Sequence, residues 1–140
     1  MRTAVTLIAG GIALAAAASA LGWAARADDG KPASFTQAQV DQGQDLYRAN
    51  CASCHGQNLN DGEFAPALKS MGFRTKWSGQ SVGALFAYAT ANMPPGQAGV
   101  LGPDDYAALT AFMLHANGAA ASDKALPADA QTLSGLNWPH

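Results

Sequence analysis

The stretch RANCASCHGQNLNDGEFAPAL, from Arg48 to Leu68, contains the only two cysteines of the 140-residue chain. Cys51 and Cys54 stand three positions apart, and His55 follows directly. On a helical turn, residues at i and i+3 share a face, so both thiols can reach one partner group while the next residue presents its imidazole to the same place. The cysteines can therefore form a disulfide, bind a metal ion or attach a cofactor.

Two of these roles lack support elsewhere in the sequence. A thioredoxin-like redox pair needs a strand followed by a helix, and no strand pattern precedes Cys51. A structural zinc site needs a fourth ligand and usually a second pair of cysteines, whereas only His115 and His140 remain, far along the chain. The C-x-x-C-H pattern is instead typical of covalent c-type haem attachment. It favours one covalently bound haem c over a surface disulfide or a chance match.

The N-terminus has the features of an export signal. Arg2 is followed by an uncharged stretch up to Ala25, and Ala25-Arg26-Ala27 matches the small-x-small cleavage pattern. We expect residues 1–27 to be a signal peptide. An uncleaved membrane anchor is the alternative, since the uncharged stretch is long enough to span a bilayer, although its alanine and glycine content would make partitioning into lipid weak. Both interpretations place the domain outside the cytoplasm, in the periplasm, with membrane contact only if the signal stays uncleaved.

Composition narrows the class of protein further. A chain of this length corresponds to one domain. The formal net charge of −2 gives no electrostatic footprint for binding nucleic acid. Hydrophobic residues make up 49% of the chain, but alanine supplies much of that fraction. A bound apolar cofactor would compensate for the resulting scarcity of large core side chains.

Helix signals dominate the part of the chain after the signal. Thr36, with Gln39 three residues on, predicts a helix start, and that helix should run to about Asn50. A second helix begins at Ser81 and cannot continue through Pro94-Pro95-Gly96, and a third begins at Pro103 and ends at Asn117-Gly118. No alternating strand pattern appears, so we expect an all-α fold with long loops.

The chain divides into four segments. The signal is followed by a polar lead over 28–34, a domain over 35–118 that carries the periodic apolar pattern, and a C-terminal tail over 119–140 rich in Ala, Ser, Asp and Pro. The tail either wraps the surface of the domain or stays mobile. The side chains available for wrapping are Leu126, Leu133, Leu136 and Trp138.

The segment from Phe35 to Gly118 resembles the class I c-type cytochromes. GQDLYRANCASCHG is similar to the first helix of that family running into its haem site, and NMPPG is similar to the loop that carries its second iron ligand. The resemblance implies a small cytochrome c fold, with three main helices and long loops wrapped around one haem. In that fold, Gly43 and Tyr47 of the first helix cross Leu109 and Phe112 of the last.

The resemblance also implies the roles of individual residues. Thioether bonds would form at Cys51 and Cys54, and the iron would have His55 as proximal and Met93 as distal ligand. The Pro66 carbonyl would accept a hydrogen bond from the His55 ring, which fixes the imidazole and raises its basicity. The haem environment would further include Leu68 against the haem and the Trp77 indole, which either reaches a haem propionate or fills the core.

The sequence also indicates which methionine would serve as the distal iron ligand. Met71 is the rival of Met93 as the distal ligand, but it follows His55 by only 16 residues and lacks a rigid strap. Pro94 restricts the backbone just beyond Met93, and a preorganised ligand loses less entropy on binding. Met113 is expected to pack in the core. Met/His ligation raises the haem potential relative to ligation by two nitrogens.

Among charged and aromatic candidates near the haem, Arg74 and Lys76 either pair with the propionates or stay solvated. His115 is expected at the surface, near the end of the last helix, where a cation suits the helix dipole.

These expectations lead to an electron-transfer protein and not an enzyme. With both axial positions occupied, substrate cannot reach the iron, and no distal His/Arg pair suited to peroxide cleavage is visible. The expected task is one-electron transfer from a dehydrogenase to an oxidase or another cytochrome. The segments SVGALFAYATANMPPG and LGPDDYAALTAFMLHANG, together with the tail, look most like small cytochromes that serve quinoprotein alcohol dehydrogenases or are fused to them. The alternatives are a fixed cytochrome subunit of a dehydrogenase complex, or a haem sensor or enzyme with a labile distal ligand.

Overall fold

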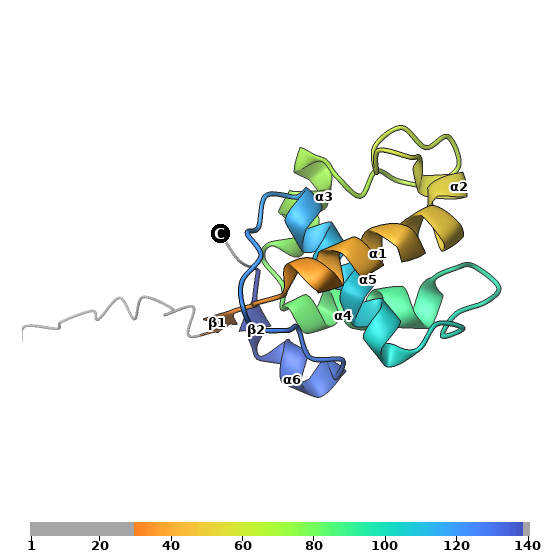
Figure 1. The fold of residues 1–140 in the computed structure, drawn as a ribbon. Coiled ribbons are helices and arrows are strands. Elements are labelled where there is room, and N and C mark those ends of the chain that lie inside the picture. The colour runs from red at the N-terminus through yellow and green to blue at the C-terminus, as the bar shows by residue number, and fades with distance from the viewer. Residues whose placement is uncertain (1–29, 139–140) are drawn as a thin grey trace, which may run out of the picture.

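The computed structural model describes residues 30–138 and is built mainly of helices (Figure 1). The elements in chain order are β1 (Lys31–Pro32), α1 (Gln37–Asn50), α2 (Ala52–His55), α3 (Met71–Trp77), α4 (Val82–Asn92), α5 (Pro103–Ala116), α6 (Ala130–Ser134) and β2 (Leu136–Asn137). The expected all-α fold is confirmed, and α1, α4 and α5 are the three main helices. The sequence predicted a helical turn at the cysteines, which is α2, but not the short helices α3 and α6 or the two-residue strand pair.

Helix α1 begins as its sequence predicts. The Thr36 hydroxyl accepts a hydrogen bond from the Gln39 backbone N–H at 3.2 Å, and the Gln39 side-chain oxygen accepts one from the Thr36 N–H at 3.2 Å. This reciprocal capping box satisfies two donors that the first turn of a helix leaves unpaired. The same Gln39 amide also bonds both backbone groups of Leu126, so the start of α1 is joined to the C-terminal tail.

Helices α1 and α5 cross in close contact (Figure 1). The crossing point is Gly43, where a Cβ atom would lie 2.1 Å from the Ala108 carbonyl oxygen and 2.8 Å from the Phe112 Cβ. One turn further on, the rings of Tyr47 and Phe112 lie 5.4 Å apart. Glycine at the crossing is therefore required by the distance between the two backbones, and the nearest backbone is that of Ala108 and not Leu109.

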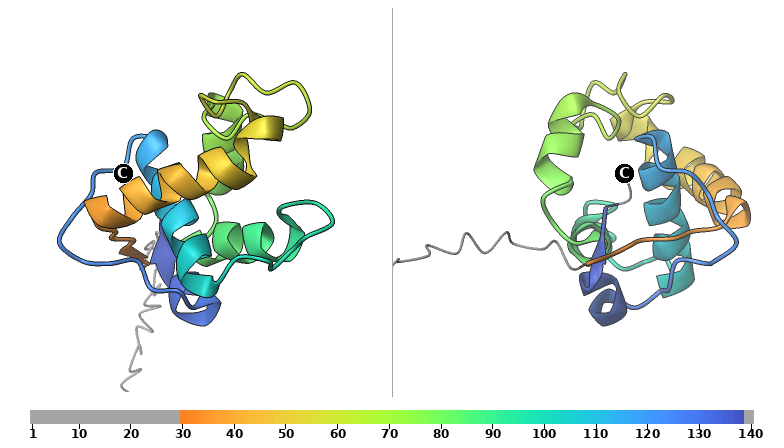
Figure 2. Two further views of the ribbon diagram at one scale, coloured as in Figure 1. Left: turned by 45° about the vertical axis from the view of Figure 1, so that its right-hand side comes forward. Right: turned by 90° about the vertical axis from the view of Figure 1, so that its left-hand side faces the viewer.

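The C-terminal tail wraps the domain. Leu126, Leu133 and Trp138 are buried. Helix α6 packs against α4 at Gly83, where a Cβ would lie 2.6 Å from the Ser134 backbone nitrogen. Strand β2 then pairs in parallel with β1, so the polar lead and the end of the tail lie side by side (Figure 2). The sequence left open whether the tail packs against the domain. The contacts show that the tail does so up to Trp138.

The export signal expected over 1–27, its cleavage site and His140 lie outside the described residues. Within 30–138, no helix is long and apolar enough to cross a membrane.

Candidate functional site

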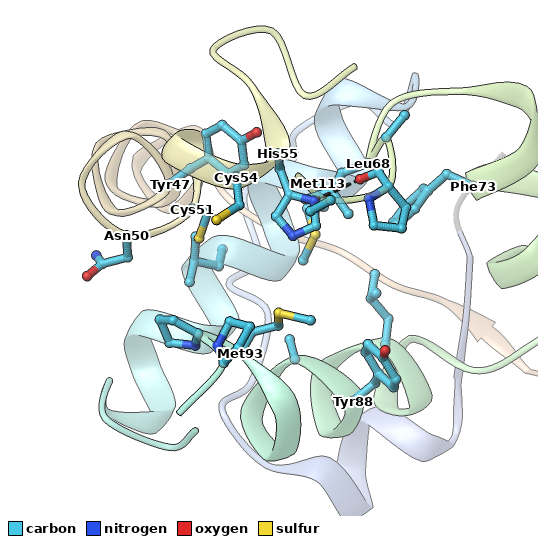
Figure 3. Close-up of a pocket in the computed structure, with 18 of the residues that line it drawn as sticks. Tyr47, Asn50, Cys51, Cys54, His55, Leu68, Phe73, Tyr88, Met93 and Met113 are labelled. Carbon is cyan, nitrogen blue, oxygen red and sulfur yellow. Dashed lines mark hydrogen bonds between the residues drawn. The ribbon is translucent and has the colours of Figure 1, made fainter. Parts of the chain in front are cut away.

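A cavity of about 810 Å³ opens between α2, the loop that follows it, α3, α4 and α5 (Figure 3). Its volume lies within the range of about 300–1,000 Å³ found for small-molecule and cofactor sites. Apolar and aromatic side chains dominate its walls. Every site residue that the sequence predicted lies in this wall: Cys51, Cys54, His55, Pro66, Leu68, Trp77 and Met93.

The two cysteines lie on the short helical turn α2 and at its start. The backbone N–H groups of Cys54 and His55 both donate to the Cys51 carbonyl, at 3.1 and 3.0 Å, which forms the turn. Both residues line the cavity, and both thiols are free and not joined in a disulfide. Burial raises the pKa of the Cys51 thiol to about 11, and the neighbouring Cys54 adds to the shift. The haem-free chain therefore carries Cys51 as a neutral thiol at neutral pH.

Tyr47 fastens this turn to α1. Its hydroxyl is buried and donates to the Gly56 carbonyl at 2.6 Å. Burial, with smaller contributions from Cys51 and Asp61, raises the pKa of Tyr47 to about 12, so the hydroxyl remains a donor over the physiological range. Sequence reasoning placed Tyr47 at the helix crossing but missed this second role.

His55 is oriented by a hydrogen bond on the side of its ring away from the cavity. Its Nδ1 lies 2.7 Å from the Pro66 carbonyl oxygen, and a carbonyl can only accept, so Nδ1 carries the proton and donates. The other ring nitrogen, Nε2, is then the atom with a free lone pair. Figure 3 shows the ring directed into the cavity. A buried imidazole held in this tautomer is prepared to bind a metal ion through Nε2.

Hydrogen bonds also hold the loop that supplies the Pro66 carbonyl. The Leu59 carbonyl accepts from the N–H groups of Leu68 and Lys69, at 2.6 and 3.1 Å. The Asn117 side chain, at the end of α5, donates to the Leu68 carbonyl at 2.8 Å. Asn117 was recognised in the sequence only as a helix stop, because nothing local indicates a bond to a residue 49 positions away.

Met93 lies across the cavity from His55 (Figure 3). It follows the last residue of α4, and its N–H donates to the Ala89 carbonyl at 2.9 Å. Its own carbonyl accepts from the buried Tyr106 hydroxyl at 2.6 Å, and that hydroxyl accepts in turn from the Gly99 N–H at 3.0 Å. The Met93–Pro94 peptide bond is cis. Tyr106 therefore positions both ends of the loop after α4, a role that its place in the apolar stripe of α5 did not reveal.

The other methionines lie in different surroundings. Met71 begins α3, is 75% exposed and does not line the cavity. Met113 is buried on α5 and contributes to the cavity wall. Met93 is thus the methionine that faces His55 across the cavity.

An aromatic cluster forms the wall at α3 and α4. The Trp77 ring lies 6.3 Å from that of Phe73 and 5.5 Å from that of Tyr88. Phe73 also contacts Trp138 of the tail, with ring centroids 6.0 Å apart, so the tail supports this wall from behind. Lys76 reaches over the same cluster, whereas Arg74 does not line the cavity.

Within residues 30–138, no group of three or more His, Cys, Asp or Glu side chains is arranged so that it could hold a metal ion. His115 is exposed, and its Nδ1 lies 3.0 Å from the Ala119 carbonyl. The zinc interpretation of the cysteines therefore lacks ligands in this region.

The donor set fits a covalently attached haem. Two free thiols one helical turn apart, an imidazole with a fixed tautomer, a thioether on the opposite wall and an apolar cavity between them are the groups that such a cofactor requires.

Comparison with known proteins gives the same class. Residues 38–113 match the family described as cytochrome c oxidase, cbb3-type, subunit III. Cytochrome c-551 of Bacillus subtilis (strain 168) is 32% identical over 63 residues, which cover 45% of this chain and 54% of that protein. The fold is similar to a chain in the crystal structure of the sulfane dehydrogenase SoxCD from Paracoccus pantotrophus, with a TM-score of 0.50 and 28% identity; the match covers 78% of this chain and 56% of that one. The chain therefore spans about half the length of each of these relatives.

Proposed function

Because the chain belongs to the cytochrome c family described as cytochrome c oxidase, cbb3-type, subunit III, and is a class I c-type cytochrome that binds haem c covalently, we propose that it carries single electrons in the periplasm. It accepts them from a dehydrogenase and passes them to a terminal oxidase or another cytochrome. The resemblance of the region around Met93 and α5 to small cytochromes of quinoprotein alcohol dehydrogenases supports that enzyme class as the donor.

Different residues of the cavity would hold different parts of the cofactor. Cys51 and Cys54 would form the two thioether bonds, and His55 Nε2 and the Met93 sulfur would bind the iron. When bound, the haem supplies an iron that changes by one electron between its ferrous and ferric states. The Pro66 carbonyl orients the His55 ring, and the Tyr106 hydroxyl holds the backbone of Met93.

The placement of His55 and Met93 on opposite walls is the observation that carries the proposal (Figure 3). If both residues bound the iron, no position would remain for a substrate, which favours electron transfer over catalysis. Electrons leave and enter at the cavity rim, where the exposed ring of Phe64 offers an apolar surface for brief contact with a redox partner.

A fixed cytochrome subunit is the second candidate. The matched family is described as an oxidase subunit, and the structural neighbour is a chain of a sulfane dehydrogenase structure, of which the match covers 56%. The chemistry is the same in both cases, and only the permanence of the partner differs. Purification from native membranes and periplasm separates them: a carrier elutes alone at the size of one chain, and a subunit elutes with its partner.

Covalent attachment is tested by extraction. The wild-type protein should keep its haem after acid–acetone treatment and on a denaturing gel, because the thioether bonds do not depend on folding. Cys51→Ala should leave at most one bond, and Ser53→Ala, in the same turn, is the matched control and should keep both. Loss of the haem from the wild type would refute the attachment.

A further inference from the structure

Lys76, on α3, is the formally charged residue in the wall of the cavity, and no Asp or Glu lines it. Its Nζ lies 4.9 Å from the centre of the Trp77 ring and 5.2 Å from the centre of the Tyr88 ring. Each distance is within the range of a cation–π interaction. The two rings therefore hold the ammonium group beside the cavity.

Among the described residues, this ammonium group has no anionic partner. Within residues 30–138, the one ion pair joins Arg48 to Asp45, on α1. Lys76 is itself exposed, so its ammonium group stays accessible at the edge of the cavity. An anion held in the cavity would attract this group, because no acidic side chain in the wall competes for it.

A haem attached at the two cysteines would bring its propionates, which are anions, to the end of the cavity near Lys76. Cys51 and Cys54 lie at one end of the cavity, and Phe73 and Tyr88 lie at the other (Figure 3). In haem the vinyl groups, which react with the thiols, and the propionates occupy opposite edges of the ring. Attachment at Cys51 and Cys54 therefore directs the propionates toward the end of the cavity where Tyr88 lies.

We propose that Lys76, held against the rings of Trp77 and Tyr88, binds a haem propionate and thereby raises the reduction potential of the iron. The inference rests on the proposed function, since it requires a haem attached at the two cysteines. A positive charge near the iron favours the reduced state, which carries one positive charge less than the oxidised state. Pairing with Lys76 also neutralises a carboxylate whose negative charge would otherwise favour the oxidised state.

Neighbouring cations provide matched controls. Arg74 is exposed, two residues away on α3, and does not line the cavity; Lys69 is exposed, just before α3, and does not line it either. Replacing any of the three by glutamine removes one positive charge from the same region. The variants therefore differ in access to the cavity and not in net charge.

The experiment measures the midpoint potential of the holoprotein by spectroelectrochemistry. Lys76→Gln should shift the potential to a more negative value, by clearly more than Arg74→Gln or Lys69→Gln, and Lys76→Arg should restore most of the loss. The proton resonances of the haem propionate methylene groups should move in Lys76→Gln and stay in place in Arg74→Gln. Equal shifts of potential in Lys76→Gln and Arg74→Gln would overturn the proposal.

Two further measurements separate other causes. Near-ultraviolet circular dichroism of Lys76→Gln should keep the wild-type signal of the Trp77 environment, and Lys76→Met, which keeps the length of the side chain without its charge, should shift the potential as Lys76→Gln does. A wild-type potential in Lys76→Met would assign the effect to packing and overturn the proposal. Failure of the proposed function would instead appear as a wild-type protein without covalently bound haem.

Discussion

Replacing Tyr106 by phenylalanine should loosen the loop that carries Met93 without changing the shape of the core. The side chain is 1% exposed, and phenylalanine fills the space of its ring, so no cavity forms. The lost hydroxyl donates to the Met93 carbonyl at 2.6 Å and accepts from the Gly99 N–H at 3.0 Å. Both backbone groups are left without this partner.

The two losses are unequal. A buried polar group left unpaired costs about 1–3 kcal/mol, and an exposed one costs little because water replaces the partner. The Met93 side of the bond is partly buried, whereas Gly99 is exposed. We therefore expect the free energy of unfolding to fall by about 1–2 kcal/mol, which corresponds to a decrease in Tm of roughly 5–10 °C for a domain of this size.

Thermal and denaturant unfolding of the holoprotein measure this change. Tyr88→Phe is the matched control, because Tyr88 lines the same cavity but its hydroxyl makes no hydrogen bond within residues 30–138. It should leave Tm within about 2 °C of the wild type, since surface substitutions usually change stability by less than about 0.5 kcal/mol. Equal Tm values for Tyr106→Phe and Tyr88→Phe would refute the reasoning.

Two further predictions concern the α1–α5 crossing and the loop after α2. Gly43→Ala should destabilise the protein by about 3 kcal/mol in urea unfolding, because the added Cβ would lie 2.1 Å from the Ala108 carbonyl oxygen. Gly79→Ala is the control and should not destabilise it, because no heavy atom lies within 4 Å of the added Cβ. The Asn58 N–H groups hold the pKa of Asp61 below its usual value, so the stability that Asp61 contributes is present above about pH 4 and is lost as pH falls through the lower, folded value. Asp61→Ala should therefore be less stable than the wild type at pH 7, and the difference should shrink on acidification below about pH 4; a difference that is independent of pH would contradict this.

The sequence predicted those features that depend only on residues close together in the chain. The capping box at Thr36 and Gln39 and the spacing of Cys51, Cys54 and His55 depend on residues a few positions apart. The backbone itself restricts such residues to one arrangement. The sequence therefore predicted α1 and the helical turn at the cysteines at their correct places.

Contacts between distant residues were not predictable in the same way. Asn117 reaches Leu68 across 49 positions, and Gln39 bonds Leu126 across 87. The hydroxyl of Tyr106 has the same character: its position in an apolar stripe indicates burial, but not that it binds the Met93 carbonyl. These bonds become visible only when the helices are packed.

Helix α3 could not be predicted from the sequence, for a third reason. With seven residues it is too short for an apolar period to stand out, and its start depends on the Ser70 hydroxyl accepting from the Phe73 N–H at 3.0 Å. Without the helix, Arg74 and Lys76 could not be assigned to different faces. Their separation, and the contact of Lys76 with two aromatic rings, follows from the structure.

The central claim is that Met93 and His55 occupy both axial positions of the haem iron, and removal of Met93 tests it most directly. The oxidised wild-type protein should show a sulfur-to-iron charge-transfer band, and the reduced protein should bind carbon monoxide poorly at neutral pH. Met93→Ala should lose the band and bind carbon monoxide readily while its haem stays attached, and Met71→Ala, an exposed methionine away from the cavity, should keep both wild-type properties. Rapid and tight binding of carbon monoxide by the wild type, or loss of the band in Met71→Ala and its retention in Met93→Ala, would contradict the account.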